Sequence, residues 1–146
     1  MPNSHSNAIQ LNSSRGCVMS VNIEKYLRNI HTPNGRIYPY LDCWGLVCYV
    51  YQNELNIQLD LCTDCQKNTM TNGYEKTKSS FTEVKTPRDF DVICYFKHSV
   101  LVHVGIYLYG HILHTDSKKG SCFEPFKMNP CMRIYRHEKM RLFYEN

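Results

Sequence analysis

The sequence has no run of about 20 apolar residues, the length that crosses the hydrocarbon core of a bilayer. We therefore expect no membrane insertion. Residues 1–18 are rich in asparagine and serine and lack the apolar segment of a secretory signal, which predicts cytoplasmic synthesis without a signal peptide. In that setting the eight cysteines are expected to be mostly reduced, and Cys48 and Cys94 fit small buried apolar positions.

Basic residues are not gathered into a stripe. Seventeen Lys and Arg stand against 13 Asp and Glu, a net charge of +4, and the only adjacent basic pair is Lys118 and Lys119. This mild excess suits anionic partners such as cell-wall polymers, whereas nucleic-acid binding usually needs a concentrated patch. We expect no nucleic-acid partner.

The chain has no internal repeat or low-complexity tract, and its 146 residues suit one core. We predict a single domain over residues 19–146, preceded by a flexible arm over residues 1–18. Helical spacing of apolar residues predicts a helix within residues 21–30 and another that begins after Asp42. The polar segment 62–87 is expected to be partly helical or irregular.

From Phe90 onward the apolar residues alternate, which predicts two strands up to Leu108. Tyr109 and Gly110 then suit a two-residue hairpin turn, followed by a return strand over residues 111–116. Closing strands are expected near Ile134 and over residues 142–144. Helices followed by an antiparallel sheet make an α+β fold.

Cys43 is the cysteine that this pattern singles out. Asp42 is a suitable N-cap, so Cys43 lies in the first turn of a helix, where backbone amides and the helix dipole favour a thiolate. The neighbouring Asp42 carboxylate opposes this effect unless it is engaged in capping. A thiol nucleophile also needs a basic partner, usually a histidine.

His103 interrupts the apolar strand with a titratable ring. Alternation places Val102, Val104 and Ile106 on one face, and Leu101, His103, Gly105 and Tyr107 on the other. With Tyr109 and Gly110 as the turn, His114 lies diagonally beside His103 and Asp116 lies directly opposite it. Both are candidates to orient the His103 ring, and the pattern does not choose between them.

Two blocks of sequence resemble the NlpC/P60 family of cell-wall cysteine peptidases, which have a papain-like fold with the nucleophile helix packed on an antiparallel sheet. The first is Asp-Cys-Trp-Gly-Leu-Val at 42–47, and the second is Val-His-Val-Gly-Ile-Tyr-Leu at 102–108 with Ile-Leu-His at 112–114. Residues 87–93 are similar to the family's Pro-Gly-Asp stretch but lack its glycine. Trp44 in place of serine is similar to the branch found in phage tail tips.

The resemblance implies catalytic roles for Cys43 as nucleophile, His103 as base and His114 as the orienting residue, with no cofactor and no metal. The expected substrate is a peptidoglycan stem peptide, cut at a D-glutamyl-type amide, and the expected partners are other phage tail-tip proteins in a virion tail. The aromatic residues expected to bind substrate are Tyr38, Tyr40, Trp44 and Tyr107.

Three alternatives compete with this interpretation. In the first, the domain is a catalytically idle structural or assembly component of a tail tip. In the second, it is an amide or acyl transferase or a toxin that uses the same Cys-His dyad. The third is a metal or redox site. Cys62 and Cys65 have the spacing of half a zinc or redox site, which His111 and His114 would complete. A single Cys-x-x-Cys is weak support for that site.

Overall fold

The computed structural model of the chain describes residues 8–12, 18–62, 74 and 77–145. The N-terminal half contains short strands and two helices: β1 (Ala8–Asn12), β2 (Val18–Asn22), α1 (Ile23–Leu27), β3 (Arg36–Ile37), β4 (Tyr40–Leu41) and α2 (Cys43–Val50), which continues into the π-helical turn η2 (Tyr51–Leu55). The C-terminal half contains η3 (Lys78–Ser80), β5 (Phe81–Val84), β6 (Val92–Lys97), β7 (Val100–Leu108), β8 (His111–Asp116), β9 (Gly120–Pro125), β10 (Met132–His137) and α4 (Glu138–Glu145).

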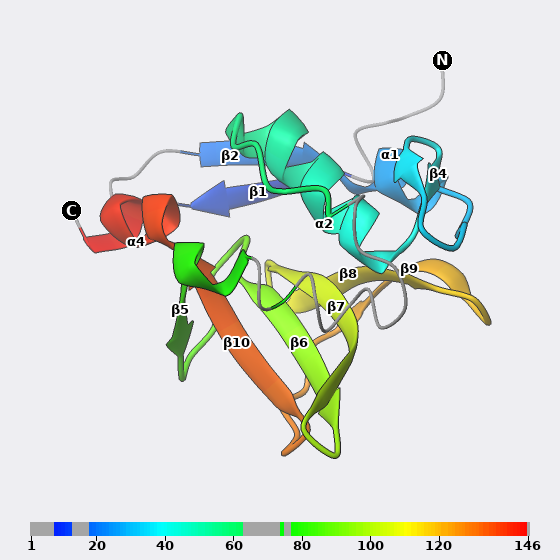
Figure 1. The fold of residues 1–146 in the computed structure, drawn as a ribbon. Helices are drawn as coiled ribbons and strands as arrows, with labels where there is room; N and C mark the ends of the chain where they lie inside the picture. The colour runs from blue at the N-terminus through cyan, green and yellow to red at the C-terminus, as the bar shows by residue number, and fades with distance from the viewer. Residues whose placement is uncertain (1–7, 13–17, 63–73, 75–76, 146) are drawn as a thin grey trace.

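Six strands form one antiparallel sheet in the order β5-β10-β6-β7-β8-β9. The helix α2 packs on β7 and β8, and β1 pairs with β2 in a separate hairpin on the same side of the sheet (Figure 1). Helix α4 contacts β10 at the end of the chain. The predicted α+β architecture is confirmed, and none of the helices in the described ranges is long and apolar enough to cross a bilayer.

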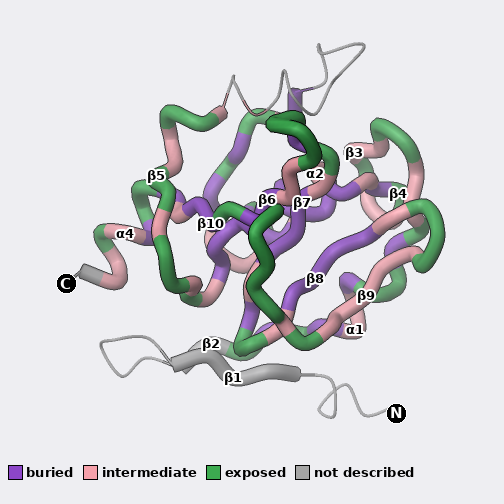
Figure 2. Tube along the Cα trace, turned by 90° about the horizontal axis from the view of Figure 1, so that it is seen from below, coloured by how far each residue is buried: buried purple, intermediate pink, exposed green. Residues whose placement is uncertain are grey.

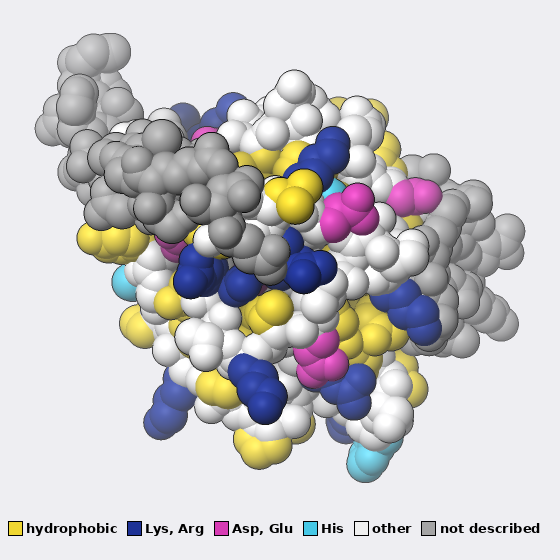
Figure 3. Space-filling view, turned by 90° about the vertical axis from the view of Figure 1, so that its left-hand side faces the viewer, with side chains coloured by type: hydrophobic (Ala, Val, Ile, Leu, Met, Phe, Trp, Pro, Cys, Tyr) yellow, Lys and Arg dark blue, Asp and Glu magenta, His cyan; other side chains and the backbone are white. Residues whose placement is uncertain are grey.

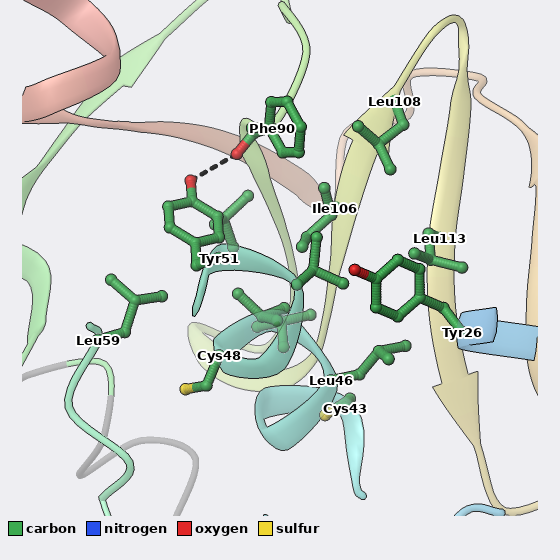
Figure 4. Packing of buried hydrophobic residues seen from close by; sticks show 14 of the residues in the cluster. Tyr26, Cys43, Leu46, Cys48, Tyr51, Leu59, Phe90, Ile106, Leu108 and Leu113 are labelled. Atoms are coloured by element: carbon green, nitrogen blue, oxygen red, sulfur yellow. Dashed lines mark hydrogen bonds between the residues drawn. The ribbon is translucent and has the colours of Figure 1, made fainter. Parts of the chain in front are cut away.

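The sheet buries apolar side chains on both of its faces. The larger cluster joins α2 to the sheet and includes Leu46, Val104 and Leu113 (Figure 4). A smaller cluster on the other face contains Ile93, Ile112, Met132 and Ile134. Consecutive buried residues lie in β6, β7 and β8 at Val92–Cys94, Val104–Ile106 and Ile112–Thr115 (Figure 2), so these parts of the strands are covered on both faces.

Helix α2 begins where the capping pattern predicts. Asp42 is the N-cap, and its Oδ1 accepts a hydrogen bond from the Gly45 amide at 2.8 Å. Gly45 has a steric role as well, because a Cβ at this position would lie 2.3 Å from the carbonyl oxygen of Gly35. The loop before the helix therefore packs against its first turn at a distance that excludes any side chain at residue 45.

The β7–β8 hairpin also follows the prediction. Tyr109 and Gly110 have φ angles of 51° and 78°, which suit a two-residue turn with both central residues in the left-handed region. Leu108 pairs with His111, and Ile106 pairs with Leu113. The register expected from the turn is thus the register observed.

The predicted faces of β7 are wrong before His103. Tyr95 pairs with His103 but Phe96 pairs with Leu101, so a β-bulge leaves Val102 without a partner residue. Leu101 is buried in the α2-facing cluster while Val102 is half exposed, the reverse of simple alternation. An extra residue in one strand changes which residues share a face, and it leaves no periodic signal in the sequence.

Several other elements differ from the predictions. The helix expected within residues 21–30 is limited to Ile23–Leu27, because Val18–Asn22 is strand β2. Residues 142–144, expected to form a closing strand, lie in α4. Strand β9 was not predicted, and strand β1 lies within the segment predicted to be an arm. The domain boundary at residue 19 remains a prediction.

Candidate functional site

Cys43 is the first residue of α2, and its thiol is buried against β7 with 5% of the residue exposed. Burial raises the pKa of the Cys43 thiol to about 11. The Val104 and Trp44 backbone amides donate toward the sulfur and oppose that rise. The resting thiol is therefore neutral at pH 7, and its sulfur lies next to the His103–Val104 peptide of β7.

Asp42 does not face the thiol as an unpaired charge. Its Oδ1 accepts from the Arg36 guanidinium at 2.6 Å as well as from the Gly45 amide. Among the smaller influences on the Cys43 pKa, Asp42 raises it and Arg36 lowers it. The ion pair thus offsets the charge that the capping residue would otherwise place beside the nucleophile.

His103 is held by a second histidine. Its Nε2 lies 2.8 Å from Nδ1 of His114, and its ring packs on Tyr95 with centroids 5.2 Å apart. Burial, followed by the proximity of His114, lowers the pKa of His103 to about 4. Gly105 permits this contact, since a Cβ there would lie 3.0 Å from the His114 Cβ.

The Cys43 thiol lies against the backbone amide of Val104, the residue after His103, and no hydrogen bond joins the thiol to the His103 ring within the described ranges. Val104 packs beneath α2, and alternation directs His103 to the opposite face together with Tyr95. The bulge at Val102 comes immediately before His103. Bulges commonly re-aim side chains near functional sites.

Asp116, the competing orienter, is engaged elsewhere. Its Oδ1 accepts hydrogen bonds from the backbone amides of Lys118 and Lys119, which closes the turn between β8 and β9. These two amides hold the pKa of Asp116 below its usual value. His114, rather than Asp116, is the residue that contacts the His103 ring.

A mostly apolar cavity opens beside the start of α2, and of the four predicted substrate-binding aromatics only Trp44 lines it. Asp42 and Val104 also line this cavity. Tyr38 stacks on Tyr49, and Tyr40 is exposed in β4.

Tyr107 lies on the sheet face opposite α2, where it packs against Phe126 with ring centroids 5.2 Å apart. Tyr107 was predicted to share a sheet face with His103, and it does. That face carries the smaller apolar cluster and lies away from α2. Tyr107 therefore does not border the cavity.

Two polar residues of the site were not found from the sequence. Arg36 pairs with Asp42, and Glu124 accepts from His114 Nε2 at 2.8 Å. Arg36 follows a turn and carries no motif. Glu124 lies in β9, and the only available signal for that strand was Gly120, whose φ of 75° helps to close the preceding turn.

The two histidines predicted to complete a zinc site lie in β8. Cys62 is buried, and Cys65 lies outside the described residues. His111 and His114 are three residues apart in a strand, so their side chains leave opposite faces of β8 and do not chelate one ion together. No cluster of three His, Cys, Asp or Glu side chains suited to a metal occurs in the part of the chain that the structure describes.

The arrangement of helix and sheet is a papain-like fold. The NlpC/p60 domain of the peptidoglycan hydrolase SagA superposes with a TM-score of 0.51 at 16% identity, covering 70% of this chain and 82% of that domain. NlpC1 from Trichomonas vaginalis gives a TM-score of 0.54 at 18% identity, covering 79% of this chain and 41% of that protein. No curated protein sequence gives a significant match.

A model of the NlpC/P60 family matches residues 31–136, most of the chain. The chain belongs to the NlpC/P60 family, whose members are cysteine peptidases and hydrolases. The matched segment includes Cys43, His103 and His114 together with Arg36 and Glu124.

Proposed function

We propose that the chain is a thiol-dependent peptidase that cleaves an amide bond in the stem peptide of peptidoglycan, at a D-glutamyl residue. The observation that carries this proposal is the meeting of the Cys43 thiol with β7 at Val104, directly after a His103 ring that is hydrogen-bonded to His114. The family and the net positive charge, which suits an anionic wall polymer, add support. On the face drawn in Figure 3, Lys and Arg side chains lie among apolar, acidic and neutral ones.

In this proposal the His103 ring reaches the α2 side of β7 when substrate binds, and its Nδ1 takes the thiol proton as the Cys43 sulfur attacks the substrate carbonyl carbon. The backbone amide of Cys43, at the start of α2, stabilises the resulting oxyanion. His103 then donates the proton to the departing amine, which leaves a thioester. Water activated by the same ring hydrolyses the thioester and regenerates the thiol. Because the resting thiol is neutral, proton transfer accompanies attack rather than preceding it.

The test compares two buried cysteines of one helix. Cys43→Ala should lower the release of new amino groups from purified peptidoglycan by at least about 10³-fold, because the nucleophile is lost. Cys48→Ala, also in α2 but outside the site, should keep the wild-type rate. Circular dichroism checks that both variants fold, and mass spectrometry of the released muropeptides identifies the bond. Undiminished release by Cys43→Ala would refute the thiol mechanism.

One observation favours a second candidate, a catalytically idle component. The described residues show no hydrogen bond between Cys43 and His103, and burial keeps the thiol protonated. Hydrogen bonds of catalytic groups often tighten only when substrate binds, so this geometry is compatible with both candidates. If wild-type protein and Cys43→Ala are equally inactive on peptidoglycan from several wall types, the idle component is the better description.

We place this activity in a phage tail tip, where it would open the cell wall for penetration. The support is the Asp-Cys-Trp-Gly-Leu form of the nucleophile motif at 42–46, with Trp44 bordering the cavity. The proposal predicts cytoplasmic synthesis followed by incorporation into particles. Detection of the chain by mass spectrometry in purified virions tests it, and a chain found only in the lysate would contradict it.

A further inference from the structure

His103, His114 and Glu124 form a continuous chain of hydrogen bonds across three strands. His103 Nε2 lies 2.8 Å from His114 Nδ1, and His114 Nε2 lies 2.8 Å from Glu124 Oε1. In the β8–β9 register His114 pairs with Cys122 and Ile112 pairs with Glu124, so Glu124 is a diagonal neighbour of His114 on the same face. This series of hydrogen bonds ends in the Glu124 carboxylate, which lies outside the sequence blocks at 42–47, 102–108 and 112–114.

The Glu124 carboxylate determines which ring nitrogen donates and which accepts in each of these hydrogen bonds. An ionised carboxylate only accepts hydrogen bonds, so His114 Nε2 must carry a proton. In a neutral ring the other nitrogen, Nδ1, is then an acceptor, and His103 Nε2 must donate to it. When both imidazole rings are neutral, His103 Nδ1 carries no proton, and its lone pair can accept one.

We propose that Glu124 is a positioning residue that fixes the tautomers of His114 and His103 in series, so that His103 Nδ1 is the atom able to accept the Cys43 proton. The inference rests on the proposed function, because it assigns His103 the role of base. Glu124 acts through His114 and touches neither substrate nor nucleophile. No sequence motif marks Glu124, since the residue becomes part of the site only through the pairing of β9 with β8.

The surroundings of Glu124 fit this role. Oε1 faces His114, and the second oxygen, Oε2, accepts from the exposed Lys119 ammonium at 3.1 Å. Both hydrogen bonds hold the pKa of Glu124 below its usual value, so the residue is ionised at neutral pH. Asp116, the other nearby carboxylate, is occupied by the amides of its own turn.

Glu124→Gln tests the inference without changing side-chain size. The amide group can donate to His114 Nε2, which permits the opposite tautomers. In ¹⁵N NMR at a pH where both rings are neutral, the wild-type protein should show protons on Nε2 of His103 and His114. The variant should show a substantial Nδ1-protonated fraction at both rings. We expect kcat to fall about 10- to 100-fold with KM unchanged, the range for residues that orient a catalytic histidine.

Lys119→Met is the matched control, because it removes the exposed partner of Oε2 and keeps the bond from His114 to Oε1. It should retain the wild-type tautomers and a rate within about twofold, as expected for an exposed ion pair. Unchanged tautomers in Glu124→Gln, or Nδ1-protonated rings in the wild type, would overturn the inference. The NMR result needs no substrate, so failure to cleave peptidoglycan would refute the proposed function and leave the inference on Glu124 to be decided by the tautomers.

Discussion

At the scale of single residues, Phe90 explains how the chain manages without the glycine expected before Asp91. Phe90 has a φ of 75°, a conformation that usually requires glycine. Its amide donates to the Tyr107 carbonyl, its carbonyl accepts from the Tyr51 hydroxyl (Figure 4), and its side chain is 1% exposed. Burial of the ring and two hydrogen bonds offset the cost of a left-handed backbone.

At residue 90, glycine should destabilise the protein less than alanine does, the reverse of their usual order. Phe90→Ala loses the buried ring but keeps the positive φ, so we expect a destabilisation of about 3–5 kcal/mol. Phe90→Gly loses the same ring but relieves about 1–2 kcal/mol of backbone strain, and it should be the more stable of the two. Urea unfolding measures both values. A Phe90→Gly variant less stable than Phe90→Ala would show that the backbone is not strained at this position.

Residues of the site were predictable where the signal was local. Asp42 and Cys43 are adjacent in sequence, and capping chemistry places both at the start of a helix. The contact between His103 and His114 followed from one turn and the alternation of a strand. Arg36 lies 6 residues before its partner Asp42, and Glu124 lies 10 residues after its partner His114. These contacts depend on the tertiary fold, and no rule of sequence spacing predicts them.

At the scale of elements, the first turn of α2 depends on its contact with the preceding loop. Gly45 lies against the Gly35 carbonyl, and Leu46 donates its amide to the Asp42 carbonyl as the helix begins. The backbone amide of Cys43, the proposed oxyanion donor, is in this same turn. Displacement of the turn would therefore shift the nucleophile and the donor together.

Gly45→Ala should lower both activity and stability. The added Cβ would lie 2.3 Å from the Gly35 carbonyl oxygen, so the loop or helix must move by roughly 1 Å. We expect a loss of about 1–3 kcal/mol in unfolding free energy and a loss of activity of up to about 100-fold. Kinetics on peptidoglycan and urea unfolding separate the two effects.

Gly110→Ala is the matched glycine variant at a distance from the site. A Cβ there meets nothing within 4 Å, so only the φ of 78° opposes the change. We expect about 1–2 kcal/mol of destabilisation and wild-type kinetics. If both variants affect activity equally, close approach at Gly45 has no special importance for the nucleophile.

Elements were predicted best where turn chemistry and periodicity agreed. The β7–β8 hairpin satisfies both, since its turn residues accept positive φ and its strands alternate. Leu142, Phe143 and Tyr144 form a short apolar run that is compatible with either helix or strand, and the packing of α4 on β10 decides between them. The bulge at Val102 depends on pairing with β6 and was not visible in β7 alone.

At the scale of the whole molecule, the half-buried His103 and the buried His137 couple folding to pH. Burial lowers the pKa of His103 to about 4 and also lowers that of His137, whose ring packs on Phe81 with centroids 5.0 Å apart. An unfolded chain would protonate both rings near pH 6.5. Between that pH and the lower folded values, the unfolded state binds more protons than the folded state, so stability falls as the pH is lowered.

The double variant His103→Gln/His137→Gln should lose much of this dependence. Between pH 6.5 and 5, we expect the slope of unfolding free energy against pH to decrease by about 1–2 kcal/mol per pH unit relative to the wild type, since two proton-uptake sites of the unfolded state are removed. Urea unfolding at several pH values gives both slopes.

His98→Asn, which replaces an exposed ring in the turn between β6 and β7, serves as the control and should keep the wild-type slope. The comparison of slopes matters here, because the double variant will also change stability at every pH through lost packing. An unchanged slope would mean that the two rings take up protons in the folded state as readily as in the unfolded chain, and that burial on the sheet does not keep His103 neutral.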